Sequence, residues 1–416
     1  MKYSYDMILN KLSFAYKDAK KNVKNAEDVK QFDKNKKVNL ENLACDMFMR
    51  DYDTLYLKCF IVYDPVMREV FAPNFRDRIV SHFIYNLLIP IYERTFIYDS
   101  YSCRVGKGTH FGADRAYHNL ASCSDNFRKN TYVLQMDISG YFMSIDNQIL
   151  HDRVSEIINR YKYERDSNGM IYDDYIDFDL LDFLQRRIIF RKPLSKCYKV
   201  GDEKEWDKLP PNKSMFNSPD GVGLIIGDLM SQVYSNVYLS KFDNYITETL
   251  QFKHYGRYVD DAYIMSNNKE ELEMLIPKMI TFLKEKLGLT LHPHKTKIVN
   301  MWSGFTFLGF CIKPYHMTIR KRTLHKVRQR FYFIAHLLPN DFKKAGYEKI
   351  ENTMAIINSC FGHLRHGYTY NIRKELIEKN PIFKKYFDID EDYLKVTLKK
   401  KSKTLCNGAE NTTGKQ

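Results

Sequence analysis

Two adjacent aspartates, Asp260 and Asp261, stand inside the apolar stretch HYGRYVDDAYI at residues 254–264. Successive side chains of a strand point to opposite faces, so one of the two would face the core of a continuous strand. A hairpin with the pair at its tip avoids this, because a cation and solvent then share the site and the cost of burying a charge disappears. The sequence therefore predicts a hairpin that carries two carboxylates at its tip.

A third carboxylate follows from the stretch TYVLQMDISGYF, an apolar strand that ends at Asp137. The next residue, Ile138, offers a backbone carbonyl as a further oxygen ligand. Phosphoryl transfer between nucleotides uses two Mg²⁺ ions about 3.5–4 Å apart, and Mg²⁺ prefers carboxylates, waters and phosphates. A YxDD string can arise by chance and a strand-end aspartate is usually a turn residue, so the prediction of a two-metal site rests on the ordered set. Mn²⁺ is expected to be able to substitute.

The balance of charge points to a polyanionic partner. The chain has 416 residues, a formal net charge of +14 and 44% hydrophobic residues, enough for a large core and two or three subdomains. Neutralising phosphates releases counterions and adds affinity, which favours nucleic acid over a membrane, although a merely soluble basic protein remains an alternative on charge alone.

The elements that position these carboxylates alternate between strand and helix. Two strands at LYLKCFIVYDP and REVFAP flank a turn at Asp64 and Pro65, and a helix follows over about 75–95. An α+β core is completed by five further elements. They are the strand ending at Asp137, the helix after GVGLIIGD, the hairpin with the two aspartates, the amphipathic helix KEELEMLIPKMITFLKEKLG and the hairpin GFTFLGFCIKP. Beyond Pro314 the pattern is helical, and the last residues are expected to be disordered.

Three features narrow the setting of the chain. Arg104, Gly106, Lys107 and Gly108 form a basic Gly-rich loop before a helix that Thr109 could cap, an arrangement that suits phosphate. The eight cysteines form no CxxC pair and indicate a reduced, cytosolic protein. No stretch has the composition of a leader peptide or the length to span a bilayer, so neither export nor a membrane anchor is expected.

Five stretches resemble, in order along the chain, the successive palm motifs of a reverse transcriptase: DISGYF, GLIIGDLMSQ, YVDD, HPHKTKI and FTFLGF. The resemblance extends over about residues 60–374. Within that family, the chain is similar to the bacterial enzymes of diversity-generating retroelements and of antiphage defence. The stretches that carry this similarity are FIVYDPVMREVFAPNFRDRIV, FIYDSYSCRVGKGTH, the Ser231–Gln232 pair and CFGHLRHGYTY. The resemblance implies a right-hand polymerase fold with an antiparallel palm sheet and a helical thumb.

The same resemblance implies domain boundaries. An N-terminal extension and fingers are expected over residues 1–130, and a palm over 131–312 with a fingers insertion around 156–220. A helical thumb is expected over 313–395, followed by a basic, disordered tail over 396–416.

By resemblance, Asp137, Asp260 and Asp261 hold two metal ions and Lys295 protonates the departing pyrophosphate, unless it is only a strand-edge lysine. Phe142 takes the position of the residue that blocks a 2′-hydroxyl, with ordinary core packing as the alternative. The remaining nucleotide-binding candidates are Arg68, which grips the triphosphate, and Ile226, Gly227 and Gln232 of the second palm motif.

Template and primer contacts are implied at four further positions. Arg104 and Lys107 are expected near phosphates, with a solvated surface role equally open. Leu308 and Gly309 belong to FLGF, which resembles the primer grip, although a plain hydrophobic hairpin is a serious alternative.

Two positions depart from the common pattern. Many reverse transcriptases have a glutamine where this chain has Ile226; the retroelement group likewise has an aliphatic residue there and copies adenine with low fidelity. We hypothesise relaxed base selectivity. Ile225 stands where that group usually has proline, which weakens the assignment to its mutagenic branch.

The sequence thus predicts a cytoplasmic RNA-directed DNA polymerase that uses Mg²⁺, dNTPs, a primer and an RNA template, either a noncoding RNA or a template repeat. A retroelement enzyme, with a small accessory protein, and an antiviral defence enzyme both remain open. The alternative of another class is a catalytically inactive RNA-binding scaffold with a polymerase fold.

Overall fold

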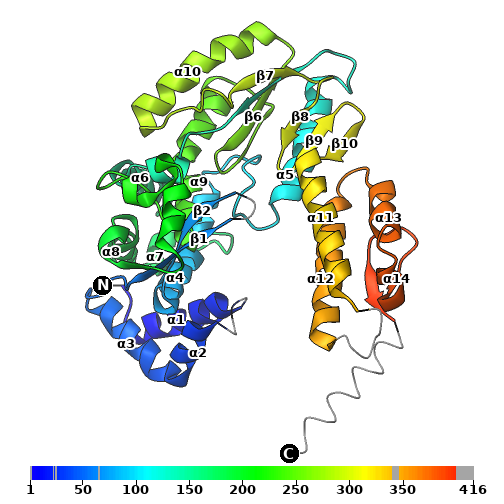
Figure 1. Cartoon of the computed structure of the whole chain (residues 1–416). Helices are drawn as coiled ribbons and strands as arrows, with labels where there is room; N and C mark the ends of the chain where they lie inside the picture. Colours follow the sequence, from blue (N-terminus) through cyan, green and yellow to red (C-terminus); the bar gives the residue numbers. More distant parts are fainter. Residues whose placement is uncertain (1, 22, 24–25, 64–65, 340–345, 400–416) are drawn as a thin grey trace, which may run out of the picture. The chain divides into compact units, whose positions relative to one another are not determined.

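The computed structural model describes residues 2–21, 23, 26–63, 66–339 and 346–399 (Figure 1). The chain divides into two units, each made of separate stretches of sequence. Unit 1 contains residues 1–103, 136–263 and 270–297, and unit 2 contains residues 104–135, 264–269 and 298–416. The expected boundaries of fingers, palm and thumb stay a prediction.

Unit 1 begins with three helices, α1 (Tyr5–Lys20), α2 (Glu27–Lys34) and α3 (Lys36–Phe48). The Ser4 side chain caps α1 by accepting a hydrogen bond from the Met7 backbone N–H at 3.3 Å. Helix α1 packs against α3 and against the long helix α4 (Phe75–Glu93) through residues at helical spacing, such as Ile8 and Leu12.

The expected N-terminal hairpin is present in unit 1. Strand β1 (Leu57–Val62) pairs antiparallel with β2 (Arg68–Ala72), and β4 (Cys197–Lys199) adds in parallel on the other edge of β1. The turn expected at Asp64 and Pro65 lies outside the described residues.

The interior of unit 1 is built around helix α9 (Leu229–Asn244). Twelve of its 16 residues are buried, because α4 and α6 (Asn147–Tyr161) both pack against it. The other elements here are η1 (Tyr141–Ser144), α7 (Tyr172–Tyr175), α8 (Phe178–Ile189), the short 3-10 turns η2 to η5 between Pro193 and Asn217, and the π-helical turn η6 (Tyr245–Thr249).

The expected strands around the carboxylates are also present. β3 (Tyr132–Met136), β5 (Tyr255–Tyr258), β6 (Asp261–Ser266) and β7 (Lys297–Asn300) form a sheet in the order β5-β6-β3-β7. Residues 133–136 of β3 are all buried, which explains the apolar run in the sequence. The amphipathic helix α10 (Lys269–Leu287) follows β6 as expected.

Unit 2 contains α5 (Thr109–Cys123), a three-stranded antiparallel sheet and the C-terminal helices. The sheet has the order β10-β9-β8, from β8 (Phe305–Phe307), β9 (Phe310–Lys313) and β10 (His316–Ile319). Helices α11 (Lys321–Leu337) and α12 (Tyr347–Leu364) run side by side, followed by α13 (Tyr370–Glu378) and α14 (Ile382–Tyr386) (Figure 1). The mixture of helices and sheets in both units confirms the α+β class.

Two expectations for unit 2 need correction. Gly108, with φ of 127°, takes the N-cap position of α5, and Thr109 is already the first helical residue, so Thr109 does not cap the helix. In the tail expected to be disordered, β12 (Val396–Leu398) pairs with β11 (Phe387–Ile389), because Val396 is fully buried and its backbone bonds to the Asn358 side chain. Residues 400–416 lie outside the described part of the chain.

Within the described ranges, no helix is both long and apolar enough to cross a membrane. The seven cysteines in those ranges are all free thiols.

Candidate active site

The turn that carries Asp260 is a two-residue connection between β5 and β6. Its residues are Val259 and Asp260, so Asp261 is the first residue of β6 and not part of the tip. The expected hairpin is therefore confirmed, with its tip one residue earlier than the sequence suggested. Val259 has a φ of 56°, a left-handed conformation that is strained for a β-branched residue. Such strain persists only where the surroundings hold the backbone in place.

A buried polar network supplies that hold. The Arg257 guanidinium donates through Nη1 to the Val259 carbonyl at 2.8 Å and through Nε to Asp243 Oδ1 at 2.7 Å. The Ser102 hydroxyl accepts from the Val259 backbone N–H at 3.3 Å and bonds to Asn236 Oδ1 at 2.8 Å. The side chains of Arg257 and Asp243 are 1% and 0% exposed. Both polar groups of the strained peptide are thus fixed from the interior of unit 1.

Asp137 follows the buried strand β3 and meets Lys295. The Lys295 Nζ lies 2.6 Å from Asp137 Oδ2, and the two side chains are 58% and 19% exposed. The segment that carries the lysine is held by the same residue, since the His292 backbone N–H donates to the Asp137 carbonyl at 2.8 Å. The sequence expected both residues at the site, and the structure brings them into direct contact.

The backbone of Ile138 lies in an isolated antiparallel bridge with Leu291. The hydrogen bonds of this bridge are made by the flanking residues Asp137 and Ser139. In such a pair the N–H and carbonyl of the central residue point away from the partner strand. The Ile138 carbonyl is therefore directed away from Leu291.

The carboxylates of Asp137 and Asp260 repel each other. Burial raises the pKa of Asp260 from 3.8 to about 6, and the negative charge of Asp137 adds to the rise, while Lys295 and Arg68 oppose it. Asp137, Lys295 and Arg68 therefore all lie within electrostatic reach of Asp260. A cation between the carboxylates would relieve this repulsion.

The carboxylates do not form a closed metal cage. Across the described part of the chain, no three His, Cys, Asp or Glu side chains are grouped so that they could hold a metal ion. The donors available at the site are carboxylate oxygens and a backbone carbonyl, which suit a hard divalent cation that keeps some of its waters. The donor set therefore fits Mg²⁺ or Mn²⁺ as an ion shared with substrate phosphates.

The candidate nucleotide-binding residues Phe142 and Ile226 lie at the edge of one hydrophobic cluster. Both are partly buried and pack against it. The buried members of this cluster are Leu57, Cys59, Phe71, Met143, Met215 and Ile225. Ile225 is 6% exposed, so the aliphatic residue found at this position in place of proline fills space in the core.

Gly227 meets a local steric demand. Its φ is 123°, and a Cβ at this position would lie 2.7 Å from the Phe71 carbonyl oxygen of β2. The Phe71 N–H donates to the Ile226 carbonyl at 2.8 Å, which draws the loop onto the strand. A glycine is required here by the approach to β2, a reason that the sequence did not reveal.

Arg68 and Gln232 are exposed at the ends of their elements. Arg68 is the first residue of β2, opposite Val62. Gln232 lies in the first turn of α9, where its Oε1 accepts a hydrogen bond from the Cys103 thiol at 3.0 Å.

The remaining four predicted residues belong to unit 2, whereas the carboxylates belong to unit 1. Arg104 and Lys107 lie in the turn before α5, where the Lys107 ammonium lies 4.2 Å from the centre of the Phe111 ring. Leu308 and Gly309, with φ of 50° and 90°, form the two-residue turn between β8 and β9. Their template and primer roles stay predictions.

Sequence reasoning missed Glu69, a fully buried carboxylate on β2. It accepts hydrogen bonds from Trp206 Nε1 and the Met215 backbone N–H, both at 2.7 Å, and from the Ser214 hydroxyl. Burial raises its pKa, although these bonds favour the charged form. Glu69 therefore ties the loop around 203–217 to the strand that begins with Arg68. The available signal was the acidic residue directly before the apolar run VFA of β2.

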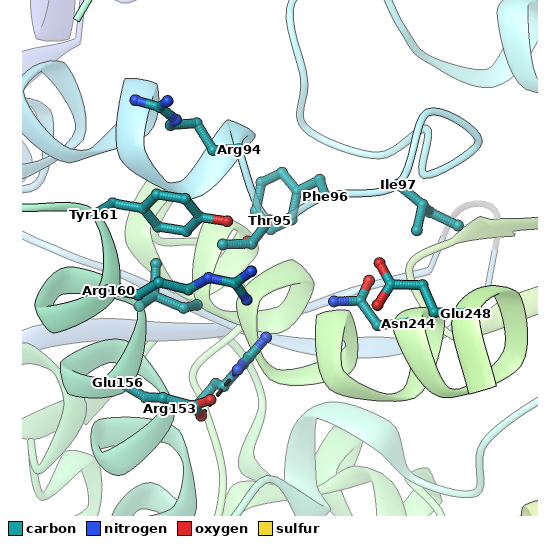
Figure 2. Close-up of a pocket in the computed structure, with 11 residues that line it drawn as sticks. Arg94, Thr95, Phe96, Ile97, Arg153, Glu156, Arg160, Tyr161, Asn244 and Glu248 are labelled. Carbon is teal, nitrogen blue, oxygen red and sulfur yellow. Dashed lines mark ion pairs between the residues drawn. The ribbon is translucent and has the colours of Figure 1, made fainter. Parts of the chain in front are cut away.

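A separate cavity of about 140 Å³ in unit 1 lies between the end of α4, the second half of α6 and the end of α9 (Figure 2). Its arginines are Arg94, Arg153 and Arg160. Arg94 pairs with Glu164 at 2.6 Å, Arg153 pairs with Glu156 at 2.9 Å, and the wall also holds Glu248. Two of the three arginines of this cavity are therefore paired with acidic side chains.

Comparison with known proteins gives three kinds of match. Residues 66–312, more than half of the chain, match the model of the family described as reverse transcriptase (RNA-dependent DNA polymerase). Protein YkfC of Escherichia coli strain K12 is 24% identical over 289 residues, which cover 62% of this chain and 64% of that protein.

The solved structures to which this chain is similar include telomerase from Candida albicans with a TWJ fragment of telomeric RNA. That match has 12% identity and a TM-score of 0.44, and it covers 81% of this chain and 56% of that one. Apo telomerase from Candida tropicalis gives 14% identity and a TM-score of 0.45 over 79% and 59%. The chain thus covers less than two thirds of the length of each of these relatives. On the family match, this chain belongs to the reverse transcriptase (RNA-dependent DNA polymerase) family, whose right-hand polymerase fold the sequence predicted.

Proposed function

We propose that this chain is an RNA-directed DNA polymerase that extends a primer with dNTPs along an RNA template. The observation that carries the proposal is the convergence of Asp137, Asp260 and Lys295 at the ends of neighbouring strands in a member of this family. Paired carboxylates that repel each other, beside a lysine, are the arrangement that nucleotidyl transfer needs.

The metal ions of this reaction would be held by Asp137, Asp260 and Asp261 with the Ile138 carbonyl. When bound, two Mg²⁺ ions neutralise charge on the attacking and leaving oxygens. In the chain by itself, the Lys295 ammonium provides the positive charge next to Asp137.

The side chains around the carboxylates have separate tasks in this proposal. Lys295 donates a proton to the pyrophosphate as it leaves, which is general acid catalysis. Arg68, exposed at the start of β2, binds the triphosphate through charge-assisted hydrogen bonds. Phe142 excludes a 2′-hydroxyl, and Gly227 with Gln232 shapes the floor under the incoming nucleotide.

The proposed biological role has two forms. A retroelement enzyme copies a template repeat with help from a small accessory protein, and a defence enzyme copies a dedicated noncoding RNA. We place either one in the cytoplasm. Sequencing the RNA that co-purifies with the chain distinguishes them, because a template repeat and a structured noncoding RNA differ in sequence and origin.

Single-nucleotide incorporation on an RNA template tests the proposed activity. The wild-type chain with Mg²⁺ and its co-purified RNA should add one dNTP to a primer, and Asp260→Ala should abolish the addition. Asp152→Ala, which changes a 67% exposed carboxylate on α6, is the matched control and should retain it. Wild-type incorporation no higher than that of Asp260→Ala would favour the alternative, an inactive RNA-binding scaffold.

A further inference from the structure

Unit 2 contains a cavity of about 300 Å³ between helix α5 and the turn that joins α12 to α13. We call it the α5 pocket and define it by Asp114, Tyr117, His118, Arg365, His366 and Tyr368, with Met317 on β10 at its wall. Its size is at the low end of the range of about 300–1,000 Å³ for small-ligand sites. The pocket therefore fits a group the size of one nucleobase.

The backbone that forms the pocket is fixed without a ligand. Asp114, Tyr117 and His118 stand three and four residues apart on α5 and so share one face of the helix. On the opposite side, the Tyr368 N–H donates to the Met317 carbonyl at 3.1 Å, and the Thr369 hydroxyl donates to the Leu364 carbonyl at 2.6 Å. The Tyr368 side chain itself remains 73% exposed.

One wall of the pocket is a supported aromatic surface. The His366 ring stacks on His110 at 3.8 Å between centroids and 15° between planes, and His110 Nε2 lies 3.0 Å from His363 Nδ1. Burial lowers the pKa of all three histidines, that of His110 to about 4. Near neutral pH the wall is therefore uncharged and offers ring surface.

We propose that the α5 pocket binds one unpaired base of single-stranded RNA. Tyr117, Tyr368 and His366 offer aromatic surface for stacking, which is how proteins hold splayed-out bases. The Asp114 carboxylate accepts hydrogen bonds from base N–H groups, and the exposed Arg365 binds the adjoining phosphate. The formal net charge of +14 favours a polyanion over an apolar peptide as the occupant. This inference rests on the proposed function, in which RNA is the template.

Fluorescence anisotropy with a labelled single-stranded RNA of about 12 nucleotides measures this binding without primer or dNTPs. Tyr368→Ala should weaken binding about tenfold, since it removes one stacking contact. Tyr332→Ala is the matched control, because Tyr332 is a 65% exposed tyrosine on α11 of the same unit, outside the pocket. Equal losses in the two variants, or none in Tyr368→Ala, would overturn the proposal.

The identity of the base gives a second measurement. A carboxylate accepts two hydrogen bonds from guanine, so a uridine tract with a single guanosine should bind several-fold more tightly than uridine alone. Asp114→Asn should remove this preference while Tyr368→Ala weakens binding to both RNAs. A preference that survives Asp114→Asn would refute the role of the carboxylate.

The same oligonucleotide made as DNA separates template from product. We expect the DNA to bind more weakly and to show little response to Tyr368→Ala; an equal response would replace RNA by the DNA strand as the occupant. Incorporation on a preformed primer–template is measured in parallel. If the wild type is active but the pocket variants bind RNA as the wild type does, the RNA-binding role of the pocket is refuted and the proposed activity stands. If the wild type is inactive but its RNA binding depends on the pocket as expected, only the proposed polymerase activity is refuted.

Discussion

Arg257 and Asp243 form a buried ion pair directly behind the turn that carries Asp260. The Arg257 Nε donates to Asp243 Oδ1 at 2.7 Å, while Nη1 of the same guanidinium donates to the Val259 carbonyl at 2.8 Å. One buried cation therefore links the helix α9 to the strained peptide next to a candidate metal ligand. This connection between the core and the site can be broken at either end.

Replacing Arg257 by methionine should destabilise the chain strongly. The change leaves the Asp243 carboxylate buried without its cationic partner, which costs about 3–5 kcal/mol in free energy of unfolding. Urea unfolding followed by circular dichroism measures this. Arg186→Met is the control, because it breaks an exposed pair with Asp182 and should cost less than about 1 kcal/mol. Similar costs for the two variants would contradict a central role for the buried pair.

Ser102→Ala should separate positioning of the turn from stability. The variant removes the acceptor of the Val259 N–H and is expected to cost about 1–3 kcal/mol, so that the fold survives. Because Asp260 is adjacent to the released peptide, kcat for dNTP incorporation should fall while KM for the dNTP stays close to that of the wild type. A lower stability with an unchanged kcat would show that the network supports the fold only.

The elements around the site were predictable because their patterns are local. The strands β3, β5 and β6 are recognisable from short apolar runs bounded by turn residues. Helix α10 is recognisable from the helical period of its apolar residues. The register of the tip was not predictable, because a valine in a left-handed conformation is disfavoured by itself. Its support comes from Ser102 and from Arg257, which Asp243 holds in place, and both Ser102 and Asp243 are distant in sequence.

The reason for a glycine at position 227 shows the same limit. A resemblance between motifs places Gly227 near the nucleotide, whereas the structure shows that β2 would meet a side chain there. Similarly, an acidic residue such as Glu69 is expected to face solvent. Its burial is explained only by its hydrogen bonds with Trp206 and Met215, which lie far along the chain. Contacts between distant segments are not visible in a single sequence.

Asp260→Asn should stabilise the chain when metal is removed with a chelator. The pKa of Asp260 is raised to about 6, so at pH 7.5 the fold contains a charge that burial and Asp137 disfavour. A neutral side chain avoids this cost, and the free energy of unfolding should rise by about 1 kcal/mol or more. Added Mg²⁺ should stabilise the wild type and have a smaller effect on the variant. Asp152→Asn should change neither value; a destabilised Asp260→Asn would contradict the repulsion.

The histidine cluster of unit 2 predicts a loss of stability in mild acid. Burial and the neighbouring His366 and His363 lower the pKa of His110 to about 4, whereas an unfolded histidine has a pKa near 6.5. Between these values the unfolded chain binds a proton that the fold does not, so stability is fully present above pH 6.5 and falls as the pH drops toward 4. His110→Gln should lose less stability between pH 7.5 and 5 in urea titrations. An equal loss in both proteins would assign the acid sensitivity to other groups.

Ile226→Gln should change the accuracy of copying. Ile226 packs at the edge of the same hydrophobic cluster as Phe142. In the proposed function it offers only apolar surface to a nascent base pair. A glutamine can hydrogen-bond to the pair and so adds a geometric check that an aliphatic side chain lacks. Primer extension with each single dNTP should show fewer misincorporations with the variant, above all opposite template adenine. Ile226→Leu keeps the apolar surface and should copy like the wild type. If the error spectra of Ile226→Gln and the wild type coincide, base selection is set by other residues and the aliphatic side chain at this position does not determine fidelity.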